Sequence, residues 1–171
     1  MLRADLMCAE TTLLHPRVHS TVERFGITAE ILECRPEWAD TAEFCANYGI
    51  PAEDTCNTII VVLKTTPRGY VACLARSDTK LDVNHKLAAI TGTKKMSFAS
   101  GEETTILTGM MIGGVTVLGL PSDMPLLIDE RVMERARIVV GGGNRASKLL
   151  LSPAELLKLP GSRVADLTIP R

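Results

Sequence analysis

Residues 108–119 read TGMMIGGVTVLG and place four glycines inside an otherwise apolar run. Glycine weakens helices and strands alike, so an ordinary buried element would not carry so many. The run is also too short to cross a membrane, which takes about 20 apolar residues. The glycines therefore predict a backbone that bends sharply or lets a ligand come close.

A second glycine cluster reads GGGNR, from Gly141 to Arg145, and directly follows the β-like run of residues 138–140. We therefore expect two glycine loops, each joined to a buried strand. Neither loop has the spacing of a Walker phosphate loop or of a dinucleotide-binding fingerprint. A nucleotide-binding enzyme is for that reason the weakest of the functions considered.

A chain of 171 residues with 46% hydrophobic and 23% charged residues suits one globular domain. Aromatic residues make up only 4%, which argues against a base-stacking platform for single strands. The net charge of -1 predicts no global attraction to nucleic acid. A local basic patch is retained as an alternative, because five basic residues are close in sequence: Arg131, Arg135, Arg137, Arg145 and Lys148.

The five cysteines are odd in number, and no two of them have CxxC spacing. They are interpreted as reduced thiols in a cytoplasmic protein, most of them small core residues. The three histidines do not supply clustered metal ligands, so we expect neither a metal nor a cofactor. No charged-then-apolar leader opens the sequence, so secretion and a membrane partner are not expected.

The element pattern predicts an α/β (mixed α+β) domain around one sheet. Apolar periodicity predicts a helix over residues 17–25, which Gly26 ends, and Thr41 is the expected cap of a second helix over 42–48. A continuous β-branched run predicts a buried strand at 58–63, returning as a hairpin to 74. Shorter strands are expected at residues 27–34, 94–99, 126–129, 138–140, 149–151 and 164–169. Further helices are expected over residues 81–89 and 130–136, and two more are expected to begin at Ser100 and at Ser152.

In this order, four features resemble the YbaK family, also called the prolyl-tRNA-synthetase-associated editing domain. They are the opening around Phe25-Gly26-Ile27, the strand at 58–63, TGMMIGGVTVLG, and VVGGGNR followed by residues 149–155. The resemblance runs from about Val18 to the C-terminus, so residues 14–171 are taken as the editing domain and 1–13 as an N-terminal extension. It implies a single domain with a mixed, partly barrel-like sheet flanked by helices.

The resemblance also implies a function. Members hydrolyse the ester between a wrongly attached amino acid and its tRNA, and a chain of this length resembles the free-standing, trans-editing members that act on proline tRNA. The expected partner is the acceptor end of an aminoacyl-tRNA. A second, hydrolytic pocket is useful because one methylene changes the binding free energy by only about 1–3 kcal/mol. That difference is too small for one pocket to reject an amino acid of nearly the same size.

Hydrolysis of an aminoacyl ester needs donors for the developing oxyanion and a placed water. Backbone N–H groups of Gly113 and Gly114 are the candidate donors; alternatively, these glycines form a bulge that only bends the chain. Thr116 and Val117 are expected to shape the substrate pocket. Three glycines are expected to line the opposite wall or hold a phosphate, and they are Gly141, Gly142 and Gly143. Arg145 either meets the acceptor-end backbone or is solvated.

The sequence departs from the family pattern at two positions. Asn57 stands where the family has a lysine, and Val117 where it usually has a proline. Asparagine donates and accepts hydrogen bonds without a charge, and a hydrogen bond to a charged group is worth about 1.5–3 kcal/mol. Asn57 is kept as a catalytic candidate. The alternative is a catalytically weakened relative that binds tRNA ends, an aminoacyl compound or a protein partner without turnover.

Overall fold

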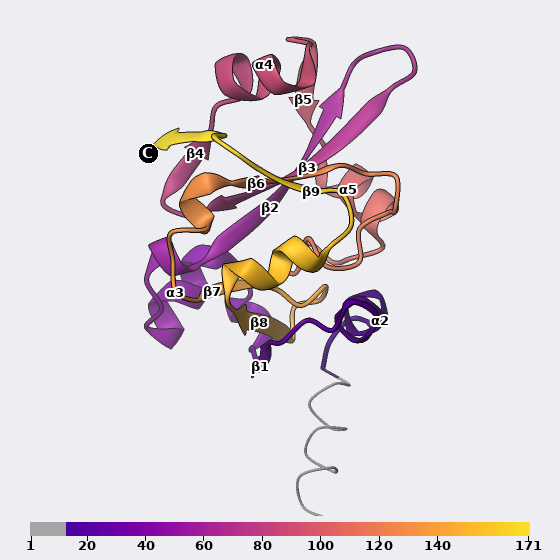
Figure 1. Ribbon diagram of the computed structural model, residues 1–171. Coiled ribbons are helices and arrows are strands. Elements are labelled where there is room, and N and C mark those ends of the chain that lie inside the picture. Colours follow the sequence, from indigo (N-terminus) through magenta and orange to yellow (C-terminus); the bar gives the residue numbers. More distant parts are fainter. Residues whose placement is uncertain (1–12) are drawn as a thin grey trace, which may run out of the picture.

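A computed structural model describes residues 13–171 (Figure 1). Its centre is the antiparallel hairpin of β2 (Cys56–Leu63) and β3 (Gly69–Arg76), paired along their whole length. β5 (Met96–Phe98) runs antiparallel to β2 on one side. On the other side β6 (Leu126–Asp129) runs parallel to β3, and β9 (Ser162–Ala165) parallel to β6. The five strands form a mixed sheet in the order β5-β2-β3-β6-β9.

A second, antiparallel sheet has the order β1-β8-β7, with β8 (Ser147–Leu151) between β1 (Glu30–Glu33) and β7 (Ile138–Gly141). A parallel bridge between Thr55 and Val139 joins it to the start of β2. β4 (Thr79–Leu81) and β10 (Thr168–Pro170) pair separately. The predicted mixed, partly barrel-like architecture is confirmed, and within residues 13–171 the sheets do not close into a barrel.

Within residues 13–171, four α-helices flank the sheets: α2 (Pro16–Phe25), α3 (Thr41–Tyr48), α4 (Ala88–Thr91) and α5 (Gly101–Thr108). Gly26 ends α2 in the left-handed region at φ 61°, which confirms the predicted glycine cap. Short 3₁₀ segments lie at Pro36–Trp38, Ala52–Asp54, Glu130–Val132 and Pro153–Lys158, and a π-helical turn lies at Val83–Leu87.

Both faces of the central hairpin are buried, as the unbroken apolar run of β2 predicts. Ile60 and Leu74 face the larger core, which the second sheet and α2 complete. Val61 and Cys73 face a smaller core beneath Leu87. The hairpin is therefore a rigid wall on which a site can be built.

Several element predictions need correction. The helix predicted over residues 130–136 is a single 3₁₀ turn at Glu130–Val132, and the segment after Ser152 is 3₁₀ rather than α. Thr41 is the first residue of α3 and not its cap. Asp40 holds the cap position, and its carboxylate binds Arg145 instead of the helix amides.

None of the helices in residues 13–171 combines the length and apolar character needed to cross a membrane. The predicted N-terminal extension, residues 1–13, lies outside the described residues except for Leu13.

Candidate active site

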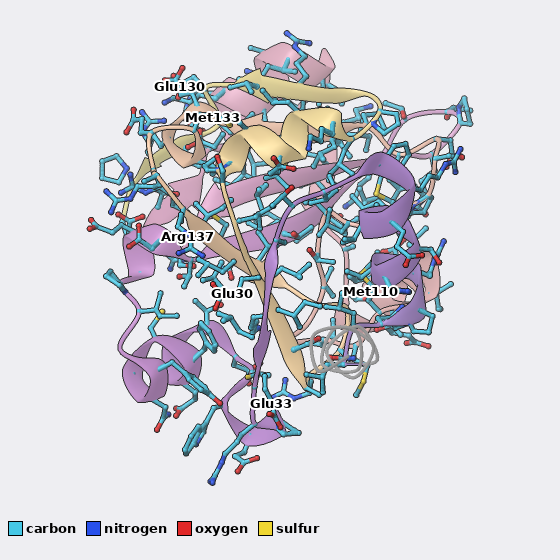
Figure 2. All side chains as sticks on the ribbon, turned by 60° about the horizontal axis from the view of Figure 1, so that its bottom comes forward. Glu30, Glu33, Met110, Glu130, Met133 and Arg137 are labelled. Carbon is cyan, nitrogen blue, oxygen red and sulfur yellow. The ribbon has the colours of Figure 1, made fainter. Side chains whose placement is uncertain are left out.

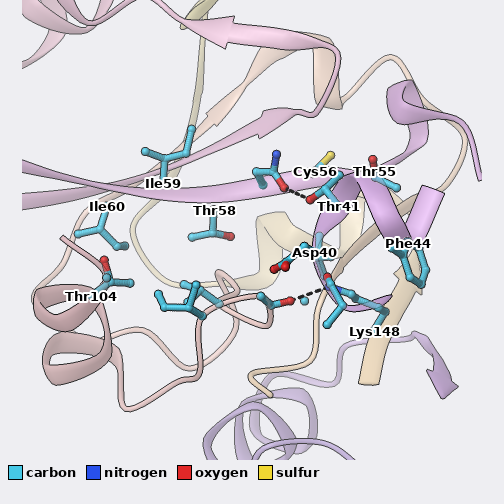
Figure 3. Close-up of a pocket in the computed structure, with 18 of the residues that line it drawn as sticks. Asp40, Thr41, Phe44, Thr55, Cys56, Thr58, Ile59, Ile60, Thr104 and Lys148 are labelled. Atoms are coloured by element: carbon cyan, nitrogen blue, oxygen red, sulfur yellow. Dashed lines mark hydrogen bonds between the residues drawn. The ribbon is translucent and has the colours of Figure 1, made fainter. Parts of the chain in front are cut away.

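A cavity of about 410 Å³ opens between the two sheets (Figure 3). The N-terminal half of β2 forms one wall, from Thr55 to Ile60. The start of α3, the turn at 112–115 and the β7–β8 strands form the others. Its volume lies within the range of about 300–1,000 Å³ that small-ligand pockets occupy.

Asn57 presents a polar side chain to this cavity from β2. Its Oδ1 accepts a hydrogen bond of 2.7 Å from Thr41 Oγ1, which fixes the amide plane. No residue in the range 13–171 accepts a hydrogen bond from its Nδ2. The amide therefore has a donor available for a ligand in the cavity.

The two glycine loops pack against each other at the edge of the cavity. A Cβ on Gly114 would overlap the backbone oxygen of Asn144, and a Cβ on Gly141 would overlap the backbone oxygen of Gly114. Gly143 N–H donates to Gly114 O at 2.7 Å. These glycines are present because two backbones approach more closely than any side chain permits.

Among residues 13–171, the turn at 111–115 leaves three backbone donors without an acceptor, namely the N–H groups of Ile112, Gly113 and Val115. Gly114 N–H donates to Met111 O at 3.0 Å, so it is engaged within the turn. Gly113 N–H and Val115 N–H have no acceptor among residues 13–171, and both residues line the cavity. Gly113 has a φ of 91°, which a side chain rarely permits.

Asn57 and the five glycines predicted for the site fall into two groups. Asn57, Gly113 and Gly141 line the cavity, whereas Gly114, Gly142 and Gly143 lie beside it in the packed glycine loops. Thr116 is fully buried, and among the residues described its Oγ1 has no hydrogen-bond partner. Val117 is also buried and lines a separate hollow of about 360 Å³ together with Phe25 and Leu120.

Lys148, on β8, reaches the cavity and was not singled out from the sequence as a site residue. It is only 7% exposed. Its Nζ donates to Ala39 O at 2.7 Å and to Gly113 O at 2.8 Å, and lies 5.5 Å from the centre of the Phe44 ring. Burial lowers the pKa of this lysine from its usual value. The available signal was a lysine inside a leucine-rich strand directly after the glycine cluster.

The cluster of basic residues suggested by the sequence is largely neutralised by carboxylates. Arg137 pairs with Glu30 at 2.9 Å, and these two side chains lie side by side in Figure 2. Arg131 pairs with Asp166 at 2.8 Å, and Arg135 with Asp54 at 2.7 Å. Arg145 donates to Asp40 Oδ1 at 3.0 Å and lowers the pKa of that carboxyl. These arginines do not form an open basic face.

Cys56 borders the cavity, but its chemistry argues against a nucleophilic role. Burial raises the pKa of its thiol to about 12, so the thiolate that attacks carbonyls is scarcely present near neutral pH. For the ester hydrolysis that the family resemblance implies, we expect Cys56→Ala to keep the rate constant within about threefold of the unmodified protein, because water would remain the nucleophile. A steady-state assay on aminoacyl-tRNA measures this, and a loss of activity in the folded variant would contradict it.

The sequence that forms this cavity matches known proteins. The family model described as "Aminoacyl-tRNA editing domain" matches residues 35–159. A curated relative from Enterococcus faecalis, "Putative Cys-tRNA(Pro)/Cys-tRNA(Cys) deacylase EbsC", is 27% identical over 122 residues, 71% of this chain and 73% of the relative.

Two solved structures share the fold. A crystal structure of a hypothetical protein superposes with a TM-score of 0.81 at 27% identity, over 90% of this chain and 99% of the other. The "Crystal structure of a putative trans-editing enzyme for prolyl tRNA synthetase" superposes with a TM-score of 0.79 at 26% identity, over 91% and 99%. The family model spans the cavity and both glycine loops, so the chain belongs to the aminoacyl-tRNA editing domain family.

Proposed function

We propose that this domain is an aminoacyl-tRNA deacylase that removes a wrongly attached amino acid from proline tRNA, acting in trans. The carrying observation is a cavity with open amide donors in a chain that the editing-domain model matches over residues 35–159. Two comparisons support the choice of tRNA: the relative whose name gives both Cys-tRNA(Pro) and Cys-tRNA(Cys) as substrates, and the structure described as a trans-editing enzyme for prolyl tRNA synthetase.

The proposed hydrolysis requires few catalytic groups. Water adds to the ester carbonyl carbon, the tetrahedral oxyanion collapses, and the ribose oxygen leaves as a hydroxyl group with a proton from that water. Donors placed where the negative charge develops lower this barrier. Gly113 N–H and the Asn57 amide are the donors that our proposal assigns to this role. The hydroxyl next to the ester on the terminal ribose would relay the proton.

The remaining candidates act around these donors. Gly141 forms the opposite wall of the cavity. Gly142 and Gly143 shape the loop that supports it, since Gly142 N–H donates to Ser147 O and Gly143 N–H to Gly114 O. Thr116 and Val117 act from beneath the turn, where they set its position rather than touch the substrate. Arg145 is tied to Asp40, so its role concerns the turn more than the tRNA backbone.

The test is hydrolysis of cysteinyl-, alanyl- and seryl-tRNA(Pro), with correctly charged prolyl-tRNA(Pro) as the control substrate. The unmodified protein should cleave at least one mischarged tRNA and spare the correct one. Asn57→Ala should lower the rate constant about tenfold, the effect of one lost hydrogen bond of about 1.4 kcal/mol. Asn57→Lys tests whether a charge at this position increases turnover. Saturable binding of every tRNA without turnover would instead favour the non-catalytic alternative.

A further inference from the structure

Lys148 is a buried cation that the chemistry above does not use. Within residues 13–171 its ammonium group makes no ion pair, and its acceptors are two backbone carbonyls. Asp40, whose charge it senses, is already paired with Arg145. A buried charge without a counter-ion is costly, and an apolar side chain of similar size is commonly neutral or better for stability. Stability alone therefore does not explain this lysine.

Lys148 and Arg145 together tie the turn at 111–115 to residues 36–40, which lead into α3, and we call this pair the cation clamp. Lys148, which Figure 3 labels at the cavity, bridges Ala39 O and Gly113 O with its Nζ. Arg145 Nη1 donates to Ile112 O at 3.1 Å and Nε to Pro36 O at 3.0 Å. Two successive carbonyls of the turn are therefore each held by a cation from the β7–β8 region.

Fixing a carbonyl also fixes an amide, because the C=O and N–H of a trans peptide point in opposite directions. Arg145 holds Ile112 O, so Gly113 N–H points away from Arg145. Gly143 N–H holds Gly114 O, so Val115 N–H points away from Gly143. Lys148, which lines the cavity, holds Gly113 O. It therefore fixes the peptide that lies between these two and carries Gly114 N–H. Of the three turn amides without an acceptor in residues 13–171, Gly113 N–H and Val115 N–H are the two whose peptide carbonyls the GGGNR loop holds. The third, Ile112 N–H, shares its peptide with Met111 O, which Gly114 N–H holds within the turn.

We propose that Gly113 N–H and Val115 N–H form a pair of oxyanion donors whose spacing the cation clamp sets. Arg145 orients the peptide of Gly113 N–H, Gly143 orients that of Val115 N–H, and Lys148 fixes the peptide between them. Lys148 and Arg145 are thus positioning residues that do not touch the substrate. This inference rests on the proposed function. It adds Val115 N–H to the proposed donors and explains why a buried lysine is kept. The lowered pKa of Lys148, caused by burial, is consistent with a group that is costly to keep charged.

Lys148→Met is the direct test, because methionine fills similar volume without a donor. The proposal predicts a kcat about 100-fold lower, as for the loss of a donor from an oxyanion hole, with KM within about threefold. Lys86→Met is the matched control, since Lys86 Nζ also binds a backbone carbonyl, Thr168 O at 2.6 Å, outside the cavity. That variant should change stability but not kcat. An unchanged kcat in folded Lys148→Met would overturn the proposal.

A second readout does not depend on turnover. Met111 N–H and Gly114 N–H are hydrogen-bonded in the clamped turn and should exchange with deuterium faster in Lys148→Met, while the β2–β3 amides keep their rates. If the unmodified protein hydrolyses no aminoacyl-tRNA, the proposed function fails while this exchange still tests the clamp. If Lys148→Met does not fold, Arg145→Gln replaces it, with the same expected loss of kcat. Exchange that stays slow in the folded variant would contradict the clamp.

Discussion

Gly114→Ala should lower kcat/KM about 100-fold, because the turn that carries the open amides would have to move by about an ångström. A methyl group at Gly114 would overlap the backbone of Asn144, and backbone cannot turn aside as a flexible side chain can. The same overlap should cost about 1–3 kcal/mol of stability, as overpacking does. Single-turnover hydrolysis and urea unfolding measure the two effects.

Gly69→Ala is the control for this prediction. Gly69 begins β3, and a Cβ there would meet only ordinary contacts, the closest at 3.5 Å from Leu63 Cβ. Its stability should change by less than about 0.5 kcal/mol and its activity should not change. Equal behaviour of the two variants would mean that the close packing of the glycine loops does not govern the site.

Asp129→Ala should be the most destabilising single change outside the cavity, by about 3 kcal/mol. Asp129 is fully buried at the end of β6. Its two carboxylate oxygens accept hydrogen bonds from Leu167 N–H at 2.8 Å and Thr168 Oγ1 at 2.9 Å, which fix the approach to β10. Alanine would leave both buried donors without an acceptor.

Urea unfolding measures this loss, with the exposed neighbour Glu130→Ala as the control. Asp129→Asn should fall between the two, because an amide of the same size still accepts one of the hydrogen bonds. If Asp129→Ala were as stable as Glu130→Ala, the buried carboxylate would not hold the β9–β10 segment in place.

The elements that local sequence specifies were predicted well. β2 could be predicted because five β-branched residues precede a turn and a returning strand. α2 could be predicted because its apolar face ends at a glycine. The segment after Ser152 resembled an α-helix start, yet it is 3₁₀. A capping signal marks where a helical segment begins but leaves open which helical geometry follows.

The site was harder to predict, because its contacts join segments far apart in sequence. Gly113 and Asn57 were identified from motif positions, and the structure places both at the cavity. Lys148 was grouped with surface arginines, since nothing local to Ser147–Leu151 reveals that Ala39 O and Gly113 O lie within reach. The open amides of Gly113 and Val115 likewise depend on hydrogen bonds to the GGGNR loop.

The most direct test of the central claim is the single-turnover rate of ester loss from cysteinyl-tRNA(Pro), with protein in excess and buffer alone as the reference. We predict an acceleration of at least about 100-fold over buffer, equivalent to a barrier lowered by about 2.7 kcal/mol. Ester loss at the rate of buffer for the cysteinyl, alanyl and seryl esters alike would contradict the account, and would leave the open amides without a catalytic role.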